Sequence, residues 1–186
     1  KLENIQKGGA IFDIEKLNWF NREYIKKMSE AELLTEIKKC LPEKDAEIIK
    51  KITPIIIERI NVFSDIKQMI DDGELSCYFA QPEYEVKNLL WKQDTDLKRA
   101  KEHLEKVTKL LEEISENKFT QDEVKKAIWD YASERGRGSV LWPMRYALSG
   151  RDKSPDPFQL AEVLGKIETI SRLKNATNKI KIKSNE

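Results

Sequence analysis

Apolar residues recur at intervals of three and four along most of this 186-residue chain, and this period constrains the fold more than any other feature. Between residues 97 and 114 the period forms one continuous seam, made of Leu97, Ala100, Leu104, Val107, Leu111 and Ile114. Such a seam is typical of a helix that packs against another helix. The isoleucine-rich stretch 45–62 resembles a strand in composition, but its charged residues fit a helical period better. The sequence therefore predicts an all-α fold.

Short polar side chains mark the expected starts of the helices, and proline and glycine mark their ends. The predicted N-caps are Asp13, Ser29 with Glu32, Thr120 with Glu123, and Asp156 followed by Pro157. The predicted stops are Pro42, Gly136 and Gly150, and Pro143 is placed in the first turn of its helix. The apolar face expected after Asp13 consists of Ile14, Leu17, Phe20, Tyr24, Ile25 and Met28. The stripe expected after Pro157 consists of Leu160, Val163, Leu164, Ile167, Ile170 and Leu173.

The break at Asp71–Gly73, followed by an aromatic cluster at 77–84, divides the predicted helices into two groups. We expect one part to span residues 1–76 and the other residues 77–186. The tail from Asn175 loses its periodicity, so it is expected to fray. Together these patterns predict an irregular bundle of about eight helices.

Composition and charge limit the classes of protein to which the chain can belong. Charged residues make up 36% and hydrophobic residues 39%, as in soluble helical proteins, and no apolar run reaches the length of a membrane span. Cys40 and Cys77 form no CxxC motif and the chain has one histidine, which argues against a structural zinc site and favours a cytoplasmic protein. Because the first residue is Lys and not Met, we expect a segment of a longer polypeptide.

Recognisable catalytic motifs are missing from the sequence. It contains no phosphate-binding glycine loop, and His103, in the charged run KEHLEK, is expected to be a solvated side chain and not a general base. We therefore assign no catalytic, cofactor-binding or metal-binding residue, and the sequence favours a binding module.

One segment concentrates positive charge. Five basic residues between positions 135 and 155 face a single acid, Asp152, in a chain whose net charge is +1; they are Arg135, Arg137, Arg145, Arg151 and Lys153. Arg145, with the proline-bounded turn of Ser154, Pro155 and Pro157, is suited to contact unpaired RNA bases. Arg135, Arg137, Arg151 and Lys153 are candidates for phosphate contacts. Trp142, beside Arg145, is expected to be a core residue.

A second hypothesis remains open from the residues alone. The basic loop is also suited to an acidic protein partner, with the seam 97–114 as part of a protein-interaction module. An RNA-binding module of another protein is a third possibility.

Four stretches together resemble the C-terminal anticodon-binding region of bacterial-type glutamyl-tRNA synthetases. GSVLWPMRYALSGRDKSPDPFQLAEVLGKIETISRL at 138–173 is similar to the family pattern P-[LM]-R-x-A-L-[TS]-G, followed by a small residue and proline and then by L-G-K-E. GGAIFDIEKLNWFNREYIKKMS at 8–29 resembles the segment after the family's KMSKS-type loop. RINVFSDI at 59–66 and YFAQPEYEVKNLLWK at 78–92 resemble the motifs between them.

The resemblance implies specific roles. Residues 1–76 would form a helical connector along the inside of the tRNA, and residues 77–186 a helical cage around the anticodon. Arg145, Ser154, Pro155 and Pro157 correspond to residues that contact anticodon bases, and Arg59 to the arginine that reads the third base. Val62 and Phe63 replace the family's Thr-Leu, and Pro157 stands where some members have Leu.

The resemblance also predicts what lies outside these residues. The parent would be a monomeric, cytoplasmic ligase that attaches glutamate to tRNA(Glu). Its ATP and Mg²⁺ would be bound by a catalytic domain that this chain lacks.

Overall fold

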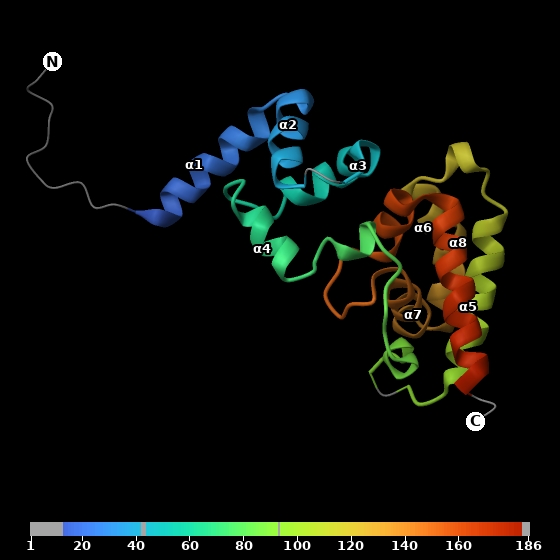
Figure 1. The fold of residues 1–186 in the computed structure, drawn as a ribbon. Coiled ribbons are helices and arrows are strands. Elements are labelled where there is room, and N and C mark those ends of the chain that lie inside the picture. The colour runs from blue at the N-terminus through green and yellow to red at the C-terminus, as the bar shows by residue number, and fades with distance from the viewer. Residues whose placement is uncertain (1–12, 42–43, 93, 184–186) are drawn as a thin grey trace, which may run out of the picture. The chain divides into compact units, whose positions relative to one another are not determined.

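The predicted all-α fold is confirmed by the computed structural model, which describes residues 13–41, 44–92 and 94–183 (Figure 1). These residues form eight α-helices and three 3₁₀ turns and contain no strand. The helices are α1 (Ile14–Lys27), α2 (Glu30–Cys40), α3 (Ala46–Ile57), α4 (Asp65–Asp71), α5 (Leu97–Glu112), α6 (Gln121–Arg135), α7 (Arg137–Ser149) and α8 (Pro157–Lys183). The turns are η2 (Ser76–Tyr78), η3 (Val86–Leu89) and η4 (Glu116–Lys118). The chain divides into two compact units, one up to Met69 and one from Ile70 onward.

The first unit begins as the capping signals predict. Asp13 accepts a hydrogen bond from the Lys16 amide, and Ser29 and Glu32 form a reciprocal capping box at the start of α2. The stretch 45–62 is helical, as its charge period indicates, but the helix ends at Ile57 and contains Pro54. α2 and α3 pack together around a core rich in isoleucine: Ile37, Ile49, Ile52, Ile56, Ile60 and Ile66. The expected stop at Pro42 lies outside the described residues.

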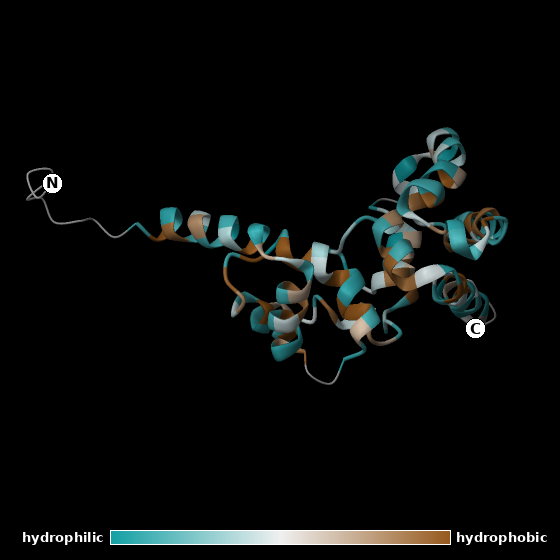
Figure 2. Ribbon diagram, turned by 90° about the horizontal axis from the view of Figure 1, so that it is seen from above, coloured by the Kyte–Doolittle hydropathy of each residue, from teal (hydrophilic) through white to brown (hydrophobic). Residues whose placement is uncertain are grey.

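The apolar face predicted for α1 is not buried. Only Ile25 among its six residues is buried, whereas Ile14, Leu17, Phe20 and Tyr24 are between 43% and 72% exposed. Within its own unit α1 touches α3 through few residues, so the amphipathic period predicts the helix correctly but overestimates its burial. Figure 2 shows hydrophobic residues interspersed with hydrophilic ones along this helix.

The second unit is built around α7, which packs against α5, α6, α8, η2 and η3 (Figure 1). The predicted seam of α5 is confirmed, because Ala100, Leu104, Val107 and Leu111 are buried between α5 and the helices α7 and α8. α6 starts at a Thr120 cap and ends at Gly136, and α7 ends at Gly150 with φ 68°, as expected. A side chain at this φ would be strained, which explains the choice of glycine.

Pro143 is not in a first turn, contrary to the prediction. α7 starts at Arg137 directly after Gly136, whose φ is 97°, so Pro143 lies buried in the helix interior. Because proline has no N–H, the helix loses one internal hydrogen bond at this point. The residues 138–140 before Pro143 are therefore helical, although the proline suggested that the helix begins later.

α8 consists of two helices joined at Gly165, where φ is 78° and ψ is 168°. Just beyond the bend the predicted stripe is wrong at Ile167, which is 72% exposed, whereas Leu173 is buried as predicted. Thr169 and Arg172, which the stripe did not include, are also buried. The tail does not fray at Asn175, since the helix continues to Lys183 and buries Ala176, Thr177 and Ile180.

His103 is buried, which corrects the expectation of a solvated side chain. The residue is 5% exposed, its Nδ1 lies 2.8 Å from the hydroxyl of Tyr131, and its Nε2 has no partner among the described residues. The KEHLEK run misleads because the histidine shares the inward face with Ala100, Leu104 and Val107. Over the described ranges, no helix is long and apolar enough to cross a membrane.

Candidate nucleic-acid interface

Arg145 lies over an aromatic ring at the surface of the second unit. Its guanidinium carbon is 4.6 Å from the centre of the Trp142 ring, one helical turn earlier on α7. Its Nη2 donates a 2.8 Å hydrogen bond to the carbonyl oxygen of Asp152 in the loop after α7. The side chain is half-buried and forms no ion pair with a described carboxylate. Its charge is therefore held in place but not neutralised.

The aromatic ring beneath Arg145 is fixed on several sides. The indole Nε1 of Trp142 donates to the carbonyl oxygen of Asn88 at 3.0 Å, and the ring packs against Trp91 and Tyr146. The Asn88 amide donates in turn to the Tyr146 hydroxyl at 3.1 Å. Burial, with a contribution from Asp152, raises the pKa of Tyr146, so this hydroxyl stays protonated. Trp142 is half-buried and not the core residue that was expected, and its ring lies under the Arg145 guanidinium.

Trp91 reaches this position because residue 138 is glycine. A Cβ at Gly138 would lie 2.1 Å from Nε1 of Trp91 and 2.6 Å from two ring carbons. These distances leave no room for a side chain, so Gly138 is what lets the aromatic stack form against α7.

The loop between α7 and α8 is held by its own ends. The Ser149 hydroxyl donates to the Arg145 carbonyl at 2.8 Å and accepts from the Arg151 amide at 3.3 Å. At the other end, Asp156 caps α8 through the amides of Phe158 and Gln159, as its position predicted. The Arg145–Asp152 hydrogen bond then ties the loop to the guanidinium.

The predicted site residues differ in their surroundings. Ser154 and Pro155 are half-buried near Arg145 in the chain, and Pro157 is buried as the first residue of α8. Arg59 is exposed just beyond α3, in the first compact unit, whereas the other candidates belong to the second.

The four candidate phosphate contacts also fall into groups. Arg135 and Lys153 are exposed, and the exposed Arg137 lies over the Trp129 ring. The Nη1 of Arg151 instead donates to the carbonyl oxygen of Asp72 at 2.6 Å, so part of this side chain is committed to the protein. None of the four forms an ion pair with a carboxylate within the described part of the chain.

Known proteins share this arrangement of sequence and helices. A family described as "Anticodon binding domain" matches residues 15–177. The chain belongs to the anticodon binding domain family. A glutamate–tRNA ligase of Clostridium botulinum (strain Eklund 17B / Type B) is 36% identical over 187 residues, which cover 96% of this chain and 37% of the relative. A glutamate–tRNA ligase of Clostridium kluyveri is 33% identical and covers 99% of this chain and 38% of its own length.

A solved structure gives the same comparison in three dimensions. The glutamate tRNA ligase of Elizabethkingia meningosepticum, in complex with its amino acid, superposes with a TM-score of 0.72 at 30% identity. The match covers 96% of this chain and 35% of that one. The chain thus spans little more than a third of the curated relatives it matches.

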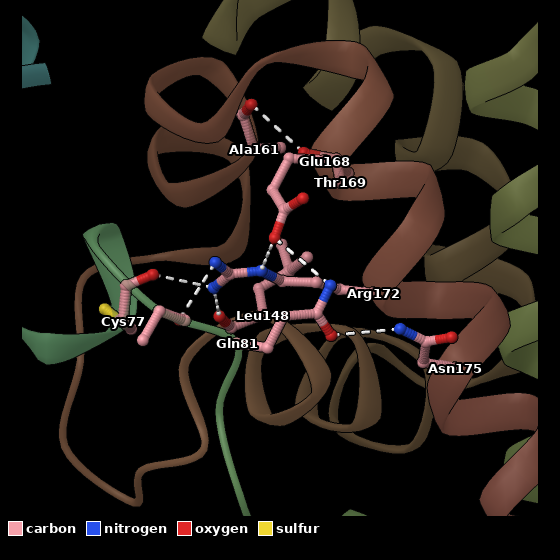
Figure 3. A network of polar contacts seen from close by, with 9 residues as sticks. Cys77, Gln81, Leu148, Ala161, Glu168, Thr169, Arg172 and Asn175 are labelled. Carbon is pink, nitrogen blue, oxygen red and sulfur yellow. Dashed lines mark hydrogen bonds and ion pairs between the residues drawn. The ribbon is translucent and has the colours of Figure 1, made fainter.

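In this member of the family, Arg172 is a buried arginine that we did not predict, and it lies behind the candidate interface. The guanidinium of Arg172 donates to the carbonyl oxygens of Cys77 and Leu148 at 2.7 Å and of Ala80 at 3.1 Å, and to Glu168 at 2.7 Å (Figure 3). It joins the end of α7 to the segment 77–80. Its position beside Leu173 on the buried face could have indicated this role. That face is found from the sequence only when the helical period is counted anew after Gly165.

Proposed function

We propose that this chain binds the anticodon loop of tRNA(Glu) and is the anticodon-binding part of a glutamate–tRNA ligase. The observation that carries the proposal is Arg145, a charged and half-buried guanidinium seated on Trp142 beside a polar loop. Membership of the anticodon binding domain family supports it, as do the names of the relatives.

Recognition would depend on differential binding. Lys and Arg contacts to phosphates supply salt-dependent affinity that does not depend on sequence. Arg145 and the loop 151–157 would contact base edges, because unpaired bases expose hydrogen-bonding edges that paired ones hide. A wrong base would leave Arg145 or a loop group without its partner, at a cost of roughly 1–3 kcal/mol for each base.

The remaining residues receive roles in the same proposal. Ser154 and Pro155 would contact anticodon bases, while Pro157, which is buried, would act by fixing the loop where α8 begins. Arg59 would read the third base from the connector, residues 1–76, and residues 77–186 would form the cage. Arg135, Arg137, Arg151 and Lys153 would contact phosphates.

The parent activity would be the attachment of glutamate to tRNA(Glu) in the cytoplasm by a monomeric ligase. ATP and Mg²⁺ would bind in the part of such a ligase that this chain does not span.

The test is a titration of the chain with tRNA(Glu) and with the same tRNA carrying altered anticodon bases, at two salt concentrations. The cognate tRNA should bind tighter, and Arg145→Ala should reduce this preference about tenfold, from roughly 1–3 kcal/mol for one base contact. Lys126→Ala removes an exposed cation from α6 and serves as the control that leaves the preference unchanged. Equal weakening of both tRNAs by Arg145→Ala would make Arg145 a phosphate contact, and equal binding of both by the wild type would refute the proposal.

The protein-interaction alternative loses its main support. The α5 seam on which it depended is buried in the bundle, so that surface is occupied.

A further inference from the structure

A second arginine on α7 repeats the arrangement of Arg145. The guanidinium carbon of Arg137 lies 4.4 Å from the centre of the Trp129 ring, compared with 4.6 Å for Arg145 over Trp142. The Lys125 Nζ lies 5.1 Å from the same Trp129 ring. Both of these cations are exposed and neither forms an ion pair with a carboxylate in the described ranges. Two positive charges thus converge on one half-buried indole.

The two arginine–tryptophan pairs lie at opposite ends of the same loop. Arg145 is hydrogen-bonded to Asp152 in the loop, and Phe158, at the loop's end, packs against Trp129 with ring centres 6.4 Å apart. Along α7 the two arginines are eight residues apart, which corresponds to a rise of roughly 12 Å. The same eight residues turn the helix by about 80° beyond two full turns, so the second pair is a separate position, far enough from Arg145 to take a different nucleotide.

Packing alone does not explain the second pair. The contact with Phe158 accounts for one edge of Trp129, but it does not require two exposed cations on the ring. A guanidinium stacked on an indole is flat and presents its other face to solvent, where it can stack with a base. An ammonium such as that of Lys125 is suited to a phosphate. The chemistry therefore matches one nucleotide: a base on Arg137 and a phosphate on Lys125.

We propose that Arg137, supported by Trp129, is a stacking platform for an unpaired nucleotide of the anticodon loop that lies outside the triplet. This inference rests on the proposed function, and it changes the role of Arg137 from a phosphate contact to a base contact. Since every base has a flat face, the platform adds affinity without reading sequence.

The test uses the whole chain and anticodon stem-loops of tRNA(Glu) in which each unpaired position outside the triplet is made abasic in turn. Removal of one base should weaken binding to the wild type about tenfold, as expected for a lost stacking contact. Arg137→Lys keeps the charge but loses the flat face. It should weaken binding of the intact stem-loop to a similar extent and abolish the effect of the abasic site. Because Arg137 is exposed, this variant should fold; Arg99→Lys, at an exposed arginine of α5 with no proposed role in binding, is the matched control.

A second readout is direct. A 2-aminopurine at the sensitive position should lose fluorescence on binding to the wild type and keep it with Arg137→Lys. Wild-type affinity in Arg137→Lys, or no sensitive position in the wild type, would overturn the platform.

The same stem-loops with altered triplets separate the two proposals. Preference for the cognate triplet should persist in Arg137→Lys, since Arg145 is intact. Loss of triplet preference in the wild type, with the abasic effect retained, would refute anticodon reading and leave the stacking platform in place.

Discussion

Replacing Arg172 should be among the most damaging single changes in the second unit. The side chain is 3% exposed, and its guanidinium donates to the carbonyl oxygens of Cys77, Ala80 and Leu148 and to Glu168. Leu148 is in the last turn of α7, where carbonyl oxygens lack a helical donor and the helix dipole favours a cation. Arg172→Ala would leave the buried carbonyl oxygens of Cys77 and Leu148 without this donor and open a cavity.

The magnitude follows from these contacts. Hydrogen bonds to a charged group contribute about 1.5–3 kcal/mol each, but they are not additive. The carbonyl oxygens of Cys77 and Leu148 are buried, whereas the Glu168 side chain is 36% exposed, so the two buried hydrogen bonds set the magnitude: we expect Arg172→Ala to lower the free energy of unfolding by about 4 kcal/mol. Arg172→Lys retains the charge without the planar fork and should cost about half as much.

The assay is urea unfolding followed by tryptophan fluorescence. A Trp19→Phe background removes the signal of the first unit, so that Trp91, Trp129 and Trp142 report on the second. Lys174→Ala is the control, because its 2.7 Å ion pair with Glu112 is exposed and should contribute less than about 1 kcal/mol. A loss below about 1 kcal/mol in Arg172→Ala would refute the view that this network holds α7, α8 and the segment 77–80 together.

Three further perturbations test other parts of the second unit. Burial lowers the pKa of His103 below its ordinary 6.5, so the unfolded chain binds a proton more readily than the folded chain does. The free energy of unfolding should therefore fall as the pH drops below about 6.5, and it should fall less in His103→Gln. Urea midpoints measured from pH 7 to 5 would test this. Gly138→Ala should cost about 1–3 kcal/mol and alter the near-UV circular dichroism of the tryptophans, because the new Cβ displaces Trp91. Gly165→Ala should cost about 1–3 kcal/mol in thermal unfolding through backbone strain alone, because no atom lies within 4 Å of the added Cβ; an unchanged melting temperature would contradict this.

The sequence predicts helices here better than it predicts which of their faces are buried. Caps such as Asp13, Ser29 and Thr120 work through hydrogen bonds three residues away, so local sequence suffices to find them. Burial depends on neighbours distant in the chain. The apolar face of α1 finds little to cover it within its unit, and His103 is buried although charged residues flank it.

The candidate site shows the same division. Arg145 and its loop could be found because their charge and proline pattern are local. Arg172 and Trp129 could not, because their partners lie up to 95 residues away or on another helix. Arg137 was identified as a cation, but nothing in the sequence places it over an indole on α6.

Gly165 has a consequence for how the last helix serves the rest of the fold. Before the bend, Phe158 faces Trp129 of α6; after it, Arg172 reaches the segment 77–80 and Lys174 pairs with Glu112 of α5. A straight helix has one inward side, so it could contact either Trp129 or the segment 77–80 and Glu112, but not both. The bend at this glycine thus lets one continuous segment turn two different sides toward the interior. The half before the bend contacts Trp129 at the end of the loop 151–157, and the half after it anchors the bundle.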